Sequence, residues 1–172
     1  MSRRLYLLRH AKSNWDDPEQ SDHERPLSGR GRRATGMIRA YLEARHVRPE
    51  LILCSSARRT RETLDGLGLQ STALIEHRLY GAGAEDLIER LRLVSSDVSS
   101  VMLIGHNPAL QILALRLARG ESPSRMAGQE GLAEIGRKLP TGALVTLEVA
   151  GEWAGLDQGS AELVDYMRPK TL

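Results

Sequence analysis

Three short runs of consecutive apolar residues restrict the architecture that this chain can adopt. They are Leu5–Leu8, Leu51–Cys54 and Val101–Ile104, and each is followed by polar residues and then by a segment with apolar residues at helical spacing. A short strand that is apolar on both faces is typical of a parallel sheet covered by helices on both sides. The repeated strand–helix order therefore predicts a three-layer α/β/α sandwich with a mostly parallel central sheet, formed by a single domain over residues 1–172.

Apolar periodicity predicts four helices in the first two thirds of the chain. Ser28 is a suitable N-cap for the first helix, and Pro108 suits the first position of the last one. The expected helices run from Ser28 to about Arg45, from the second strand through about Leu67, over Ala84–Val94, and from Pro108 through Leu117; a weak strand is expected over Ala73–Ile75.

The last third of the chain has a less regular pattern. We expect Gly120–Leu139 to be a flexible loop with one helical turn. Ala143–Val149 alternates between apolar and polar residues more than the other strands do, which predicts an edge strand. Gly151–Leu172 should cross the surface and finish near Val164–Tyr166.

Charge and cysteine content argue against several classes of protein. Lys and Arg total 24 against 22 Asp and Glu, so the net charge of +2 is too balanced for a general binder of nucleic acid or membrane surfaces. The single cysteine, Cys54, leaves no intramolecular disulfide and is expected to act as a small buried hydrophobe. The apolar start is too short for a signal peptide, and no later run approaches membrane length. We therefore expect a cytoplasmic monomer without a nucleic-acid or membrane partner.

Basic side chains follow all three apolar strands. Arg9 and His10 end the first strand, Arg58 and Arg59 follow the second, and His106 follows the third. Since the carboxyl ends of neighbouring parallel strands meet at one edge of the sheet, these groups should converge there. They repel one another unless an anion lies between them, and the planar fork of a guanidinium suits the oxygens of a phosphoryl group. A phosphate site is the resulting prediction.

These basic residues stand in motifs that resemble those of the histidine phosphatase superfamily. The short chain and the segment Arg25–Ser28 most resemble the SixA-type phosphohistidine phosphatase branch of that superfamily. The resemblance implies a phosphoglycerate mutase-like fold and runs from Arg4 to about Ala118, and more loosely to the end. The matching motifs are Leu7–Ala11, Cys54–Thr63 and Ile104–Pro108.

The resemblance also implies individual catalytic roles. His10 is the nucleophile, which becomes phosphorylated on a ring nitrogen. Arg9 and Arg59 hold the non-bridging oxygens, and His106 contacts the developing charge. Arg59 matches the superfamily pattern, rather than Arg58, because it stands four residues before the threonine that ends the second motif.

Two further residues are candidates for substrate binding, and no cofactor is expected. Ser13 falls where related enzymes place a hydroxyl near the phosphate. Arg25 either reaches the phosphate or pairs with Glu24. Positioned cations can neutralise phosphoryl oxygens without a metal, and the sequence shows no clustered Asp and His ligands, so we expect no metal.

The sequence departs from the superfamily pattern at two points. Ala11 stands where a glycine usually follows the nucleophile, so the loop has to accommodate a methyl group. No motif marks a carboxylic general acid; Glu85 is the nearest candidate, followed by Asp86, Asp16 and Asp17. An alkoxide leaves poorly without a proton, whereas the imidazole of phosphohistidine can leave already protonated. The missing acid therefore favours phosphohistidine as the substrate.

Three functions remain open from the sequence. The preferred one is a phosphatase acting on phosphohistidine in a signalling or phosphotransfer protein. The alternatives are a phosphatase for a small ester such as a sugar phosphate, and a non-catalytic module that binds a phosphorylated partner, which would not require His10. The remaining polar candidates are interpreted as surface residues: Arg58, Arg61, His23, His46 and His77.

Overall fold

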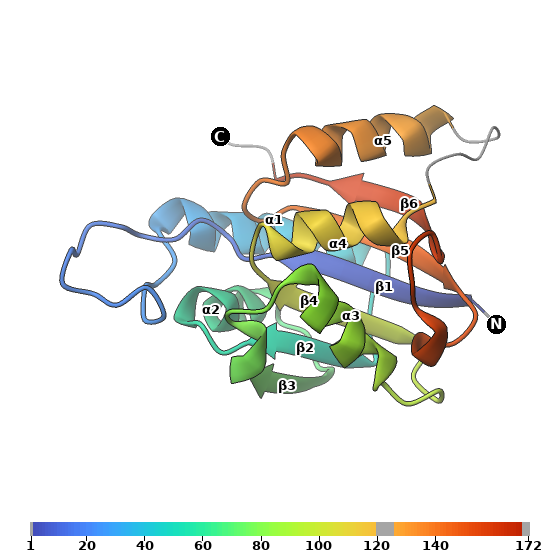
Figure 1. Cartoon of the computed structure of the whole chain (residues 1–172). Helices are drawn as coiled ribbons and strands as arrows, with labels where there is room; N and C mark the ends of the chain where they lie inside the picture. Colours follow the sequence, from blue (N-terminus) through green and yellow to red (C-terminus); the bar gives the residue numbers. More distant parts are fainter. Residues whose placement is uncertain (1, 120–125, 170–172) are drawn as a thin grey trace.

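A six-stranded sheet forms the centre of the computed structural model, which describes residues 2–119 and 126–169 (Figure 1). The strand order is β3-β2-β4-β1-β5-β6. The first four strands along the chain pair in parallel, and β5 and β6 are antiparallel to their neighbours. The strands are β1 (Ser2–Arg9), β2 (Leu51–Ser55), β3 (Thr72–Glu76), β4 (Ser100–Gly105), β5 (Leu144–Ala150) and β6 (Ala161–Met167).

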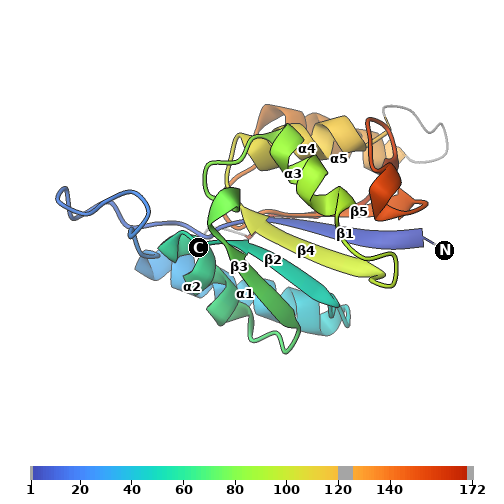
Figure 2. The same ribbon diagram turned by 60° about the horizontal axis from the view of Figure 1, so that its bottom comes forward.

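Helices cover both faces of this sheet, as Figure 2 shows. α1 and α2 lie on one face, and α3, α4 and α5 lie on the other. The predicted α/β/α sandwich is therefore confirmed. The helices are α1 (Gly29–Ala44), α2 (Arg58–Leu67), α3 (Ala84–Arg92), α4 (Ala109–Leu117) and α5 (Met126–Arg137), with short 3-10 turns at His77–Leu79 and Trp153–Gly155.

The interior parallel strands β1, β2 and β4 are apolar on both faces because each face meets a helical layer, whereas the edge strand β3 is largely exposed. In β1, Leu5 and Leu7 pack into the cluster under α3 and α4, whereas Leu8 packs into the cluster under α1. In β4, Leu103 and Ile104 divide between the two clusters in the same way. Each fully buried leucine contributes about 1.5–3 kcal/mol through removal of its surface from water.

β5 is an interior strand, so the prediction of an edge strand at Ala143–Val149 is wrong. It lies between β1 and β6. Its polar residues are matched across the sheet: Thr146 stands opposite Tyr6, and Glu148 forms an ion pair with Arg4 at 3.3 Å. The alternation in the sequence therefore reflects cross-strand pairing rather than a solvent-facing side.

α5 is a regular helix where the sequence predicts only one helical turn. Glycines within it, among them Gly131, weaken the helical pattern of the sequence. The structure explains Gly131, because an added Cβ would come within 2.8 Å of Leu163 on β6. Ile135 anchors the helix in the core. Residues 120–125, the first part of the predicted loop, lie outside the described residues.

The parallel register brings three strand ends to one edge of the sheet. Arg9 of β1 stands opposite Gly105 of β4, and Cys54 of β2 stands opposite Ile104. The residues after these strands are therefore neighbours in space although they are far apart in sequence. None of the helices in the described segments has both the length and the hydropathy of a membrane-spanning helix.

Candidate active site

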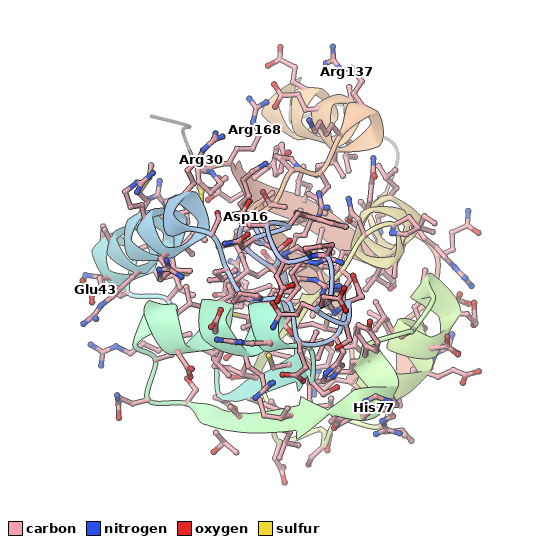
Figure 3. All side chains as sticks on the ribbon, turned by 90° about the vertical axis from the view of Figure 1, so that its left-hand side faces the viewer. Asp16, Arg30, Glu43, His77, Arg137 and Arg168 are labelled. Atoms are coloured by element: carbon pink, nitrogen blue, oxygen red, sulfur yellow. The ribbon has the colours of Figure 1, made fainter. Side chains whose placement is uncertain are left out.

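His10 and His106 face each other at this edge, as the sequence predicts. The backbone N–H of His10 donates to Gly105 O at 3.1 Å, which joins the two segments directly. The two ring centroids are 5.4 Å apart, and the ring planes are inclined at 53°. Figure 3 looks onto this carboxyl edge, with Arg30 on the α1 side and His77 on the β3 side.

The environment of His10 leaves one ring nitrogen with a free lone pair. Its Nδ1 lies 2.7 Å from Ala11 O, and a carbonyl can only accept, so Nδ1 carries the proton and Nε2 keeps a lone pair. Burial lowers the pKa of His10 to about 3, with the charges of His106, Arg59 and Arg9 acting in the same direction. The imidazole is therefore neutral at pH 7, as a nucleophile requires.

The loop after His10 is fastened to α2. The N–H of Ala11 donates to Thr63 Oγ1 at 3.0 Å, and the Thr63 hydroxyl donates to Arg59 O at 2.7 Å. Ala11 is fully buried, so its methyl group is accommodated where related chains have glycine. These bonds connect the position of His10 to the first turn of the helix that carries Arg59.

Two guanidinium groups approach the imidazoles from different elements. Arg59, on α2, is 8% exposed; its two terminal nitrogens donate to Asp22 O at 2.7 Å and to Asp22 Oδ2 at 3.1 Å. Arg9 donates from NH1 to Leu139 O at 2.9 Å. Its Nε is buried and has no hydrogen-bond partner within the described parts of the chain. Burial lowers the pKa of Arg9, and the positive charge of Arg59 adds to this effect.

His106 is positioned by the end of β2. Its Nε2 lies 2.8 Å from the hydroxyl of Ser55, which is fully buried. When Ser55 donates this bond, Nδ1 of His106 carries the proton; that atom is buried and has no partner among residues 2–119 and 126–169. Burial lowers the pKa of His106 to about 4, assisted by Arg59. The next residue, Asn107, donates to Leu139 O at 3.0 Å, the same oxygen that Arg9 contacts.

Asp22 and Tyr80 belong to this cluster, although sequence reasoning assigned neither to it. Asp22 Oδ2 accepts the Tyr80 hydroxyl at 2.5 Å in addition to the bond from Arg59. The Tyr80 hydrogen bond and the neighbouring arginines lower the pKa of the Asp22 carboxyl. The Tyr80 ring stands edge-on to His106, with centroids 5.7 Å apart. Asp22 lies in a polar segment, and such a segment is typical of a surface loop rather than of a site.

Ser13 and Arg25 lie in the same loop at the edge of the cluster. Ser13 is 8% exposed and pairs with Leu27 through an isolated β-bridge. Arg25 pairs with Asp22 at 3.0 Å. Of the two alternatives given for it from the sequence, the pair with Glu24 is not found in the described residues, and contact with a phosphate stays a prediction. The Arg25 guanidinium also lies 3.1 Å from the ring centroid of the exposed Trp15.

Two histidines interpreted as simple surface residues form a polar group beside Tyr80. His23 Nε2 lies 2.9 Å from Ser56 Oγ, and His77 Nδ1 lies 3.0 Å from the same oxygen. The His23 ring meets the Tyr80 ring edge-on at 4.8 Å. Ser56 follows β2 and His77 follows β3, and these two strands are neighbours in the sheet. Their positions after neighbouring strands are the sequence signal that could have placed both residues at this edge.

Other predicted residues lie as expected from the sequence. Arg58 pairs with Glu62 on the surface of α2, and Arg61 pairs with Glu24. Cys54 is fully buried, and burial raises the pKa of its thiol to about 12, which agrees with a small hydrophobe rather than a nucleophile.

Glu85 lies in the first turn of α3 and pairs with Arg116 of α4. Asp86 caps the same helix by accepting from Gly83 N at 2.8 Å. Asp17 accepts within its own loop, from Glu19 N at 3.0 Å. Among the described residues, the carboxylate bonded to the cluster is that of Asp22. No group of three or more metal-ligating side chains is found in the same described segments.

Comparison with known proteins agrees with this geometry. A model of the histidine phosphatase superfamily (branch 1) matches residues 5–80. Rv1276c, an uncharacterised protein of Mycobacterium tuberculosis, is 36% identical over 163 residues, which cover 95% of this chain and all of that protein. The chain belongs to the histidine phosphatase superfamily, and it is therefore a phosphatase-type enzyme.

Within the superfamily, the relatives define a narrower branch. The SixA structure from Nakamurella multipartitia, provisionally assigned as a phosphohistidine phosphatase, is 30% identical with a TM-score of 0.87; the match covers 99% of this chain and 98% of that one. Phosphohistidine phosphatase SixA of Escherichia coli is 29% identical over 125 residues, covering 69% of this chain and 76% of SixA. The protein is of the SixA type.

Proposed function

We propose that this protein is a metal-independent phosphatase that hydrolyses phosphohistidine in a signalling or phosphotransfer protein, through a covalent intermediate on His10. The observation that carries the proposal is the state of His10: neutral, buried, and fixed through Nδ1 so that Nε2 is the attacking atom. A module that only binds a phosphorylated partner would not need such a nucleophile.

In the first step, Nε2 of His10 forms a bond to phosphorus as the bond to the leaving nitrogen of the substrate breaks. The leaving imidazole takes the electron pair of that bond, and its other nitrogen already holds a proton, so it departs as a neutral group. In the second step, water attacks the phosphorus on His10, and phosphate is released while His10 recovers its lone pair. The positions of Arg9, Arg59 and His106 Nδ1 support their role as donors to the phosphoryl oxygens.

The lowered pKa of the Asp22 carboxyl favours phosphohistidine over a phosphate ester as the substrate. A general acid must hold a proton near neutral pH, but the pKa of Asp22 is lowered by its bonds to Tyr80 and Arg59. Glu85 is engaged by Arg116. Release of an alkoxide from a sugar phosphate would therefore lack a proton donor among the described carboxylates of the cluster, whereas release of imidazole needs none.

A panel of substrates tests the proposal directly. Purified protein would be incubated in excess EDTA with a phosphohistidine peptide, a phosphohistidine-bearing phosphotransfer protein and a set of sugar phosphates. We expect rapid release of phosphate from the first two and slow release from the sugars. Faster hydrolysis of a sugar phosphate, or activity lost in EDTA and restored by magnesium or zinc, would contradict the assignment.

A further inference from the structure

A second cationic region adjoins the proposed phosphate site. It is a cavity of about 510 Å³ between α1 and the segment that leads into β5. None of the described residues that line it is acidic, and its apolar contacts include Met37 and Pro140. We call it the basic pocket; its five cations are Arg9, Lys12, Arg30, Arg33 and Lys138.

Within the described residues, no carboxylate neutralises four of the five cations of the basic pocket. Several arginines outside the pocket pair with carboxylates, as in the ion pairs of Arg25, Arg58 and Arg90. In contrast, the four cations of the pocket other than Arg9 form no ion pair within the described parts of the chain: Lys12, Arg30, Arg33 and Lys138.

The location of these charges increases their mutual repulsion. Arg30 and Arg33 stand three residues apart at the start of α1, so they are neighbours on one helical face. The first turn of α1 contains no acidic residue, and the positive end of the helix dipole lies there. The chain as a whole carries a net charge of only +2, so this positive potential is local. Binding of an anion would relieve it.

Arg9 connects the basic pocket to the phosphate site, because it lines the pocket and also lowers the pKa of His10 electrostatically. An anion in the pocket and a phosphoryl group at His10 can therefore belong to one substrate. The cavity is larger than a single phosphate requires, and Met37 and Pro140 offer apolar contact to aliphatic carbons. A protein segment rich in Asp and Glu meets all three requirements: several negative charges, aliphatic stems, and continuity with the phosphorylated residue.

We infer that the basic pocket binds carboxylate side chains flanking the phosphohistidine of an acidic protein substrate. The inference rests on the proposed function and defines its substrate further. It makes the protein selective for phosphohistidine in an acidic surrounding, because each exposed cation–carboxylate pair adds a modest increment of affinity.

Binding of a non-phosphorylated peptide tests the pocket without requiring turnover. A fluorescent peptide with Asp and Glu on both sides of a central Gln would be compared with a peptide carrying Asn and Gln at the same positions. The variant Arg30→Gln/Arg33→Gln would be compared with Arg48→Gln/Arg137→Gln, which removes the same charge at exposed positions outside the cavity. We expect the pocket variant to bind the acidic peptide about 2- to 30-fold more weakly than wild type, and the control variant to match wild type.

Kinetics on the phosphorylated forms completes the test. Wild type should show a higher kcat/KM for the phosphohistidine peptide with acidic flanks than for the neutral one, and added salt should reduce this ratio. Equal affinity for both peptides, or an equal loss in the control variant, would overturn the inference. Binding of inorganic phosphate that depends on Arg30 and Arg33, without binding of the acidic peptide, would also overturn it.

The two proposals fail in different ways. If the acidic peptide binds through Arg30 and Arg33 but phosphohistidine is not hydrolysed, the proposed function is wrong and the pocket remains a site for acidic segments. If phosphohistidine is hydrolysed without regard to flanking charge, the inference about the pocket is wrong and the proposed function stands. Thermal unfolding of both double variants checks that neither has lost its fold.

Discussion

Asp22 accepts hydrogen bonds from both terminal nitrogens of the Arg59 guanidinium. One nitrogen lies 3.1 Å from Asp22 Oδ2, and the other lies 2.7 Å from the backbone oxygen of Asp22. An anion of the protein itself thus takes donors that we propose for the phosphoryl group. Substrate binding then exchanges one anion for another at Arg59, and the loop that carries Asp22 competes with the substrate.

Asp22→Asn should therefore strengthen phosphate binding. The substitution removes the competing charge, and we expect the inhibition constant of inorganic phosphate to fall about two- to fivefold, the effect of one partly exposed ion pair. Asp17→Asn, in the same loop but away from Arg59, is the matched control. A loss of kcat of about 10²–10⁴-fold with phosphohistidine would instead identify Asp22 as a general acid.

His10→Ala should abolish turnover and leave the protein folded. His10 contributes a polar side chain at a strand end, so the hydrophobic clusters remain intact. Rapid quenching of wild type during turnover should trap acid-labile, base-stable phosphate on His10, detectable by mass spectrometry. His46→Ala, at an exposed position, controls for loss of a histidine. Phosphate trapped on a serine, or turnover that survives His10→Ala, would refute the mechanism.

Acid should destabilise the fold partly through the two facing histidines. Burial lowers the pKa of His10 to about 3 and that of His106 to about 4, compared with about 6.5 in an unfolded chain. Between these values the unfolded state binds more protons than the folded state, so the free energy of unfolding is highest above pH 6.5 and decreases as the pH falls towards 4.

Urea unfolding at pH 7.5 and pH 5 measures this effect. Wild type should lose more stability between the two values than the variant His10→Ala/His106→Ala, because the variant lacks both titrating groups. Equal losses in the two proteins would show that neither histidine has a depressed pKa.

Glu85→Gln should have little effect on phosphohistidine turnover. Its ion pair with Arg116 lies at a partly exposed position, so its removal should cost less than about 1 kcal/mol of stability. Measurement of kcat/KM for phosphohistidine and for an alkyl phosphate distinguishes the roles. If the variant lost about 10²–10⁴-fold with the alkyl phosphate alone, Glu85 would be the general acid of an ester phosphatase.

The proximity of His10, His106, Arg9 and Arg59 could be predicted from the sequence. Parallel strands end at one edge of the sheet, and Arg9 ends a strand while the other three residues closely follow one. The sequence was insufficient for Asp22, whose position depends on the path of a long polar loop held by distant contacts, such as Arg58 N–H donating to His23 O at 2.9 Å. The local sequence pattern also predicted an edge strand for β5 and a single helical turn for α5, and both predictions are wrong. The polar residues of β5 and the glycine Gly131 of α5 are explained by contacts with neighbouring elements, and the local periodicity of a sequence carries no information about such contacts.

The carbonyl oxygen of Leu139 accepts hydrogen bonds from both Arg9 and Asn107. Leu139 lies in the connection between α5 and β5. A segment that supplies none of the proposed reacting groups therefore orients the Arg9 guanidinium and the turn after β4. A change in the length of that connection would therefore alter the orientation of Arg9, and with it the activity, without a substitution among the proposed reacting groups. Directed evolution for new substrates could target residues 137–143 while leaving all the proposed catalytic side chains unaltered.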